Sequence, residues 1–154
     1  MHEGVVLRLL AQRVSQGEVE VEGRVVGRIG AGLVVLVGVG QGDTEEIAER
    51  MIDKLLGLRI FADQAGKMNH SVLQAGGGVL LVSQFTLYAD CRKGRRPSFT
   101  RAGAPELAER LYQYCIDQVA ATGLPTAAGM FAADMRVSLT NDGPVTIMLD
   151  SDAL

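Results

Sequence analysis

Apolar side chains recur at every second position through much of the first forty residues, and this period constrains the fold more than any other feature of the chain. The alternation runs over residues 5–9 and again over 18–22, where valines alternate with glutamates. A period of two predicts strands with one face on the core. The run Leu33–Val39 is almost continuously apolar and largely β-branched, which favours a strand buried on both faces. With a further strand over Val25–Ile29, the N-terminal half is predicted to form a sheet.

Helical periodicity occurs at two places. Asp43, with Glu46 three residues later, gives an N-cap signal, and an apolar stripe of period 3.6 follows it. A helix is therefore predicted over about Asp43–Leu56, with Asp43 as its cap. A second helix is predicted to begin at Pro105, because proline suits the first helical turn and an apolar stripe ending at Val119 continues from it.

Three further strands complete the predicted elements. One runs over Val79–Phe85 after three consecutive glycines, and two short strands, Arg136–Thr140 and Val145–Leu149, flank a Gly-Pro pair. Strands and helices do not alternate as a doubly wound parallel sheet would require. The predicted fold class is therefore α+β, with a mostly antiparallel, curved sheet and packed helices.

Composition limits the class of protein. The chain has 154 residues, 47% hydrophobic and 21% charged, without repeats or linkers, so residues 1–154 are predicted to form a single domain. No apolar run reaches the ~20 residues of a membrane span and no signal-peptide pattern is present, which predicts a soluble, cytoplasmic protein without membrane contact. Cys91 and Cys115 fit neither a zinc spacing nor a disulfide framework, so both are predicted to be reduced thiols. The net charge of −3 disfavours a broad nucleic-acid-binding face, so any RNA contact must be local.

Two segments carry the candidate chemistry. Gly143-Pro144 lies within Leu139–Thr146, and Ser83-Gln84-Phe85-Thr86 ends an apolar run some sixty residues earlier. Proline has no backbone N–H, so in a strand it marks an edge, a bulge or a turn. Taken alone, the Gly-Pro pair is an ordinary tight turn with the prevalent trans peptide bond.

Together with other segments, these motifs resemble the D-aminoacyl-tRNA deacylase family over essentially the whole chain. The other segments, in family order, are Gln12–Ser15, Gly40–Thr44, Leu58–Phe61, Gly66–Asn69, Arg92–Gly94, Arg96–Phe99 and Ala133–Met135. The resemblance implies a small barrel-like sheet with packed helices, in a homodimer whose active sites lie at the subunit interface. It also implies hydrolysis of the ester bond of D-aminoacyl-tRNA, and of glycine mischarged on tRNA(Ala), without a cofactor.

The resemblance gives the Gly-Pro pair a specific role. In this family the bond is cis and directs two carbonyl oxygens into the active site of the partner subunit. Gly143 and Pro144 are then expected to meet the α-amino group of the substrate and to leave no room for an L side chain. Such a filter discriminates by steric exclusion, and achiral glycine passes it. A Cβ at Gly143 would narrow the approach of the backbone to the ligand.

The earlier segment supplies the other half of the predicted site. Backbone N–H groups and a hydroxyl at a strand end can stabilise the oxyanion of ester hydrolysis, and we assign this role to Ser83, Gln84 and Phe85. Thr86 has two interpretations, a catalytic hydroxyl or a β-branched strand residue bonded to a neighbour. A nucleophilic hydroxyl needs a base, and the two histidines, His2 and His70, lie outside the motif. The favoured hypothesis, taken from the resemblance, assigns catalysis to the free 2′-hydroxyl of the terminal adenosine of the tRNA, with positioning lowering the barrier.

Phe131 and Met135 match family positions that line the pocket for the aminoacyl adenosine, where Phe131 would stack on the base. Plain core packing explains both residues equally well. The family commonly has glycine directly after this phenylalanine, whereas this chain has Ala132. The difference implies a local change in backbone geometry or pocket width.

The segment Arg92-Lys93-Gly94-Arg95-Arg96 concentrates four of the fifteen basic residues. It is predicted to contact the tRNA acceptor stem through phosphates, without reading sequence. The alternative is a solvated charged turn, the usual fate of such a run.

The segment Gly38–Gly42 mimics a dinucleotide-binding turn, but Asp43 stands where that pattern requires glycine. It is predicted to be a connecting loop, and no metal is predicted because no His, Cys, Asp or Glu grouping has ligand spacing. Two other classes of function stay open: a non-enzymatic tRNA- or nucleotide-binding dimer, and a nicotinamide- or flavin-dependent enzyme that uses this loop.

Overall fold

The computed structural model describes residues 7–153, and over that range the chain forms eight strands, three α-helices and two 3₁₀ turns. The strands are β1 (Arg8–Val21), β2 (Arg24–Ile29), β3 (Gly32–Gly38), β4 (Phe61–Ala62), β5 (Met68–His70), β6 (Gly78–Ser83), β7 (Thr126–Ala128) and β8 (Arg136–Asp150). The helices are α1 (Glu45–Gly57), α2 (Val72–Ala75) and α3 (Pro105–Ala120), and the 3₁₀ turns are η1 (Phe85–Tyr88) and η2 (Ser151–Ala153). Val5 and His2 lie outside the described residues.

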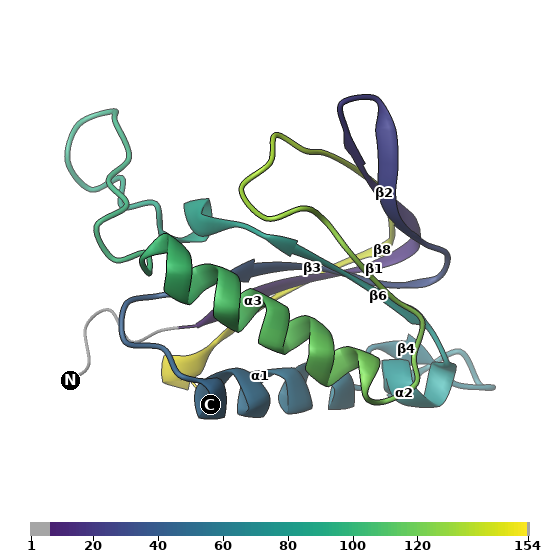
Figure 1. The fold of residues 1–154 in the computed structure, drawn as a ribbon. Coiled ribbons are helices and arrows are strands. Elements are labelled where there is room, and N and C mark those ends of the chain that lie inside the picture. The colour runs from purple at the N-terminus through teal and green to yellow at the C-terminus, as the bar shows by residue number, and fades with distance from the viewer. Residues whose placement is uncertain (1–6, 154) are drawn as a thin grey trace.

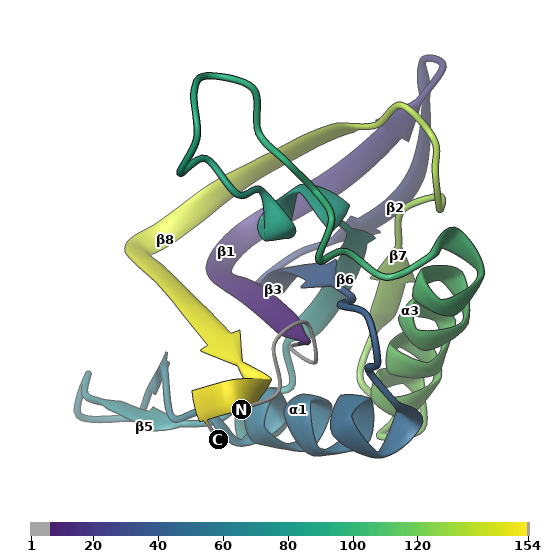
Figure 2. The same ribbon diagram turned by 90° about the vertical axis from the view of Figure 1, so that its left-hand side faces the viewer.

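One six-stranded sheet forms the centre of the molecule. Its order is β2-β1-β3-β6-β7, and β8 lies along the other edge of β1. The long strand β1 pairs antiparallel with β2, β3 and β8, whereas β3 with β6 and β6 with β7 are parallel. Figures 1 and 2 show this sheet strongly curled, with α1 and α3 packed on one face. The predicted α+β fold with a mostly antiparallel, barrel-like sheet is confirmed.

The two faces of the sheet bury separate cores. One core lies between the sheet and the helices, and the other lies inside the curl, where Val34 and Leu80 are buried. Both faces of β3 and β6 are therefore covered, which explains their continuous apolar runs. Strand β1 changes sides, because the register shift between Val14 and Gln16 reverses its alternation. Leu9 thus faces the helices, whereas Val19 faces the inside of the curl.

The curl narrows where β2 approaches β7. A Cβ on Gly27 would lie 2.6 Å from the carbonyl oxygen of Ala128. Glycine therefore allows a backbone approach that any side chain at this position would obstruct.

The predicted helices are confirmed, but the cap assigned to the first was wrong. α1 begins after Thr44, whose hydroxyl accepts the N–H of Ile47 at 3.2 Å. Asp43 instead turns back and accepts the N–H of Gly40 at 2.6 Å. Both residues are good cap formers, and the bend of the preceding loop decides between them. α3 begins at Pro105 as predicted.

β8 is a single strand where two short strands were predicted. The Asn141 side chain accepts the N–H of Val145 at 2.7 Å and donates to its carbonyl at 3.2 Å. These bonds carry the strand past the proline, which has no N–H to give. Asn141 and Thr146 pair with Val14 and Gln12 of β1, so the residues between them on β8 bulge opposite Arg13 alone.

Candidate active site

The Ser83–Thr86 segment is a turn at the end of a strand. The prediction of a strand continuing to Phe85 was wrong, because pairing with β3 ends at Ser83 and η1 begins at Phe85. The Gln84 N–H still donates to the Val37 carbonyl at 2.8 Å, which ties the turn to β3. After this bond the backbone bends, and the Gln84 carbonyl accepts from Leu87 within η1.

Two backbone donors are free at the start of this turn. Among the described residues, the N–H groups of Phe85 and Thr86 have no acceptor, as is usual for the first turn of a helix. The Gln84 side chain donates to the Thr86 hydroxyl. No histidine or carboxylate of the described chain is bonded to that hydroxyl, so no base activates it here. Adjacent free N–H groups are the arrangement that stabilises an oxyanion.

The aromatic side chain of this turn is largely in solvent. Phe85 is 57% exposed, and its ring meets Phe99 edge-on at a centroid distance of 5.0 Å. Most of this ring is therefore accessible to solvent beside the free donors.

The Gly143-Pro144 pair lies at the bulge of β8, and its peptide bond is cis, as the resemblance implied. Both residues are exposed. Gly143 has φ +142°, and a Cβ there would lie 2.8 Å from Val145 Cγ2 and 3.1 Å from Arg13 Nη2. The position therefore excludes a side chain on both conformational and steric grounds.

Arg13 fixes this bulge, a function that the sequence did not reveal. Its Nε donates to the Asp142 carbonyl at 2.9 Å, and its Nη1 donates to the Ile60 carbonyl at 2.6 Å. The guanidinium thus joins β8 to the segment after α1. Arg13 belongs to a segment that matched the family, but nothing in a strand pattern distinguishes such an arginine from a solvated one.

The two predicted halves of the site do not meet within the chain. Figure 2 shows β8 bent sharply at the left of the view, whereas η1 lies nearer the middle of the molecule. Among the described residues, no hydrogen bond or ring contact joins Gly143 or Pro144 to the Ser83–Thr86 turn.

Phe131 and Met135 follow β7 and are half-buried. The Phe131 ring lies 6.2 Å from the Tyr112 ring of α3, and Met135 packs on the core inside the curl. Ala132 between them has φ +63°, in the left-handed region that favours glycine. Core packing buries part of each side chain, and the rest of its surface is exposed to solvent.

The loop after η1 that contains the basic residues 92–96 is exposed, and hydrogen bonds join its two ends. Backbone bonds of 2.8 and 2.9 Å between Asp90 and Ser98 hold its two ends together. Arg92 hydrogen-bonds the Asp90 carboxylate and holds the pKa of Asp90 at about 2. The described residues offer no ion-pair partner to Lys93, Arg95 or Arg96.

The glycine loop before α1 satisfies its own donors. The Gly40 N–H donates to the Asp43 carboxylate, and the Gln41 N–H donates to the Arg101 carbonyl at 3.1 Å. A dinucleotide site would need such groups free for phosphate. The segment is therefore a connecting loop, and its Asp43 is 4% exposed. In the part of the chain that the structure describes, no group of three or more His, Cys, Asp or Glu residues could hold a metal ion.

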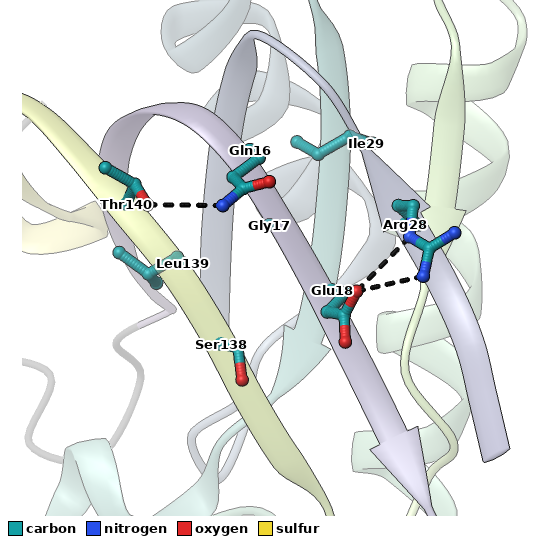
Figure 3. Close-up of a pocket in the computed structure, with 8 residues that line it drawn as sticks. All are labelled: Gln16, Gly17, Glu18, Arg28, Ile29, Ser138, Leu139 and Thr140. Carbon is teal, nitrogen blue, oxygen red and sulfur yellow. Dashed lines mark hydrogen bonds and ion pairs between the residues drawn. The ribbon is translucent and has the colours of Figure 1, made fainter.

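A groove of about 310 Å³ lies on another part of the curl, between β1, β2 and β8 (Figure 3). Its lining residues are Gln16, Gly17, Glu18, Arg28, Ile29, Ser138, Leu139 and Thr140. Arg28 is paired with Glu18, and the Gln16 amide reaches the Thr140 hydroxyl at 3.5 Å. None of the predicted site residues lines this groove.

Comparisons with known proteins define the class. The family described as D-Tyr-tRNA(Tyr) deacylase matches residues 10–150. A D-aminoacyl-tRNA deacylase of Desulfitobacterium hafniense (strain DSM 10664 / DCB-2) is 56% identical over 95% of this chain and 98% of its own. A D-aminoacyl-tRNA deacylase of Aeromonas hydrophila is 59% identical over 91% of this chain and 97% of its own. Among the described residues, no helix is long and apolar enough to cross a membrane.

Solved structures share the fold. The structure titled c-Myc DNA Unwinding Element Binding Protein superimposes with a TM-score of 0.86 at 40% identity, over 92% of this chain and 97% of its own. The structure of a probable eukaryotic D-amino acid tRNA deacylase superimposes with a TM-score of 0.83 at 21% identity, over 94% of this chain and 99% of its own. D-aminoacyl-tRNA deacylases are hydrolases that act on the aminoacyl-tRNA ester bond. The chain belongs to the D-Tyr-tRNA(Tyr) deacylase family.

Proposed function

We propose that this protein hydrolyses D-aminoacyl-tRNA in the cytoplasm, accepts glycine mischarged on tRNA(Ala), and rejects L-aminoacyl-tRNA through the backbone at Gly143 and Pro144. The observation that carries the proposal is the exposed bulge of β8, which Arg13 holds and which has no room for a Cβ at Gly143. Carbonyl oxygens on such a bulge can bind an α-amino group and obstruct one of the two side-chain directions at Cα.

The active site is completed by a second copy of the chain. The Ser83–Thr86 turn and the bulge are both exposed and do not meet in one protomer. β8 contains no fully buried residue although it carries several apolar side chains, and Val137 and Met148 are 38% and 47% exposed. In a two-fold dimer, the bulge of each subunit would enter the site of the other. Both sites then form at the interface.

The chemistry needs no protein base. The N–H groups of Phe85 and Thr86, with the Ser83 hydroxyl and the Gln84 amide nearby, would stabilise the oxyanion when water attacks the ester carbon. The 3′-oxygen of the tRNA leaves with a proton, and the products are free tRNA and the amino acid. The adjacent 2′-hydroxyl would assist proton transfer, because the Thr86 hydroxyl has no base beside it.

The remaining site residues would bind the tRNA. Phe131 would stack on the terminal base, and Met135 would line the same pocket. Arg92, Lys93, Arg95 and Arg96 would act on acceptor-stem phosphates, which suits a chain whose net charge is negative but which has four of its fifteen basic residues in this one loop.

Three substrates test the proposal. Purified protein is incubated with D-Tyr-tRNA, L-Tyr-tRNA and Gly-tRNA(Ala), and free amino acid is measured over time. We expect hydrolysis of the first and third and none of the second above the rate in buffer. Equal rates on the two tyrosyl substrates would refute the filter, and no hydrolysis of any substrate would refute the function.

A further inference from the structure

Tyr112 differs from its neighbours in the buried stripe of α3. Leu111, Cys115 and Val119 fill the core with apolar side chains, whereas Tyr112 carries a hydroxyl into it while being only 3% exposed. A buried phenol needs an acceptor. The position of that acceptor gives the residue a function beyond packing.

The hydroxyl lies where two parallel strands separate. It donates to the Leu81 carbonyl at 2.7 Å, and the Gly129 N–H donates to the same oxygen at 2.9 Å. Leu81 and Ala128 form the last pair between β6 and β7. Beyond this pair, β6 continues to the Ser83–Thr86 turn and the other segment departs. Burial raises the pKa of Tyr112 to about 12, against the effect of the nearby backbone N–H groups of Gly129 and Ser83, so the phenol stays a donor.

The same side chain contacts the departing segment. Its ring lies 6.2 Å from the Phe131 ring at an interplanar angle of 36°. One rigid residue therefore touches β6 two residues before Ser83 and touches Phe131 two residues after Gly129. Crevices at the carboxyl ends of parallel strands, where neighbouring segments diverge, are common ligand sites.

We propose that Tyr112 is a positioning residue that sets the spacing between the Ser83–Thr86 turn and Phe131. It would thereby align the ester carbonyl with the terminal nucleoside of the tRNA. The inference rests on the proposed function, in which the turn binds the reacting carbonyl and Phe131 binds the base. Phenylalanine would fill the same space, and Leu81 would keep its bond from Gly129, so the hydroxyl is not needed to satisfy the core.

Tyr112→Phe tests the inference. Single-turnover hydrolysis of D-Tyr-tRNA should slow about tenfold while the affinity for the tRNA stays within about twofold, because misplacement acts on the transition state. The matched control is Tyr114→Phe, two positions along α3, whose hydroxyl has no hydrogen bond among the described residues. It should leave the rate unchanged. Both variants are assayed below their melting transitions, so that loss of folded protein does not enter the rate.

A double-mutant cycle distinguishes positioning from general structural support. If Tyr112 acts through Phe131, then Tyr112→Phe should cost less than about twofold in a Phe131→Leu background. Full additivity, or a rate for Tyr112→Phe equal to the wild type, would overturn the inference while leaving the function standing. Wild-type protein inactive on D-Tyr-tRNA would instead refute the function itself.

Discussion

The free N–H of Phe85 is the smallest unit on which the proposed chemistry depends, and replacing this residue with proline removes it. Phe85 is the first residue of η1, a position where proline fits, and the preceding Gln84, with φ −145° and ψ 83°, lies outside the α region that a following proline disfavours. Phe85→Pro should lower the single-turnover rate on D-Tyr-tRNA by about 10²–10³, the effect of losing one oxyanion donor.

The control for this variant is Phe85→Ala, which loses the exposed ring and its contact with Phe99 but keeps the N–H. We expect it to lose less than about tenfold. Equal losses in the two variants would mean that the ring, and not the donor, matters to the reaction.

Ala132 gives a prediction about stability at the same scale. With φ +63° it occupies a conformation that costs an L residue roughly 1–2 kcal/mol. Glycine would relieve this cost, but the greater conformational freedom of glycine in the unfolded chain would offset part of the gain. Ala132→Gly should raise the free energy of unfolding by about 0.5–1 kcal/mol, measured by urea denaturation. Ala133→Gly, next to it and outside the left-handed region, should lower it. A loss in both variants would contradict the strain at Ala132.

The structural role of a residue was predictable from the sequence where local rules act alone. It was not predictable where the fold decides between two residues that are equally suited to the role. Pro105 opens α3 because its fixed φ suits that position and nothing competes. Asp43 and Thr44 are both able to cap α1, and the closed glycine loop decides for Thr44 by engaging Asp43. The role of Arg13 depends on carbonyls of residues 60 and 142, which no local pattern brings together.

At the scale of elements, β8 and the end of β6 show the same limit. Apolar residues indicated where both strands lie, but the ends of the strands depend on features outside the apolar pattern. The Asn141 side chain continues β8 past the proline, whereas β6 ends at Ser83 and the chain turns into η1. Short elements such as β4, β5 and β7 have too few residues to establish a period, so the sequence did not reveal them.

The β8 bulge is held by one guanidinium, so its geometry should respond to Arg13→Lys. Lysine keeps the charge but cannot donate in two fixed directions to the Asp142 and Ile60 carbonyls. We expect kcat/KM on D-Tyr-tRNA to fall about tenfold and the preference for D over L to fall at least about fivefold, or about 1 kcal/mol of discrimination.

Arg24→Lys on β2, an exposed position, is the matched control and should change neither quantity. If the Arg13 variant loses rate but keeps its full preference for D, the bulge does not set the chirality of the substrate.

For the whole molecule, Asp43 links stability to pH. Burial raises its pKa from 3.8 to about 6, the Gly40 N–H opposes this, and the Asp152 and Asp150 carboxylates add to it. The native state therefore holds this proton more tightly than the unfolded chain does. The stability that the protonated form contributes is present at low pH and is lost as pH rises through 6.

Between pH 5 and pH 8 this loss amounts to about 1–1.5 kcal/mol of unfolding free energy. Asp43→Asn keeps an acceptor for Gly40 and cannot ionise. The unfolding free energy of the variant minus that of the wild type should therefore be larger at pH 8 than at pH 5 by that amount. Urea unfolding at both pH values measures the difference, with the exposed Asp53→Asn of α1 as control. A difference that does not change with pH would place the ionisation of Asp43 outside this range.

The proposed dimer predicts that two defective subunits repair each other. Phe85→Pro removes a donor from the turn, and Gly143→Ala adds a Cβ 2.8 Å from Val145 Cγ2 in the bulge. In a dimer with sites shared between subunits, a heterodimer of the two variants has one site with both defects and one with neither. Random mixing makes half of the dimers mixed, so activity should return to about a quarter of the wild type, although either variant alone is nearly inactive. The subunits are co-expressed with different tags, and the mass in solution should be twice the 16.4 kDa of one chain. No recovery in a confirmed heterodimer would place both halves of the site in one subunit, and a monomer of full activity would remove the partner from the mechanism.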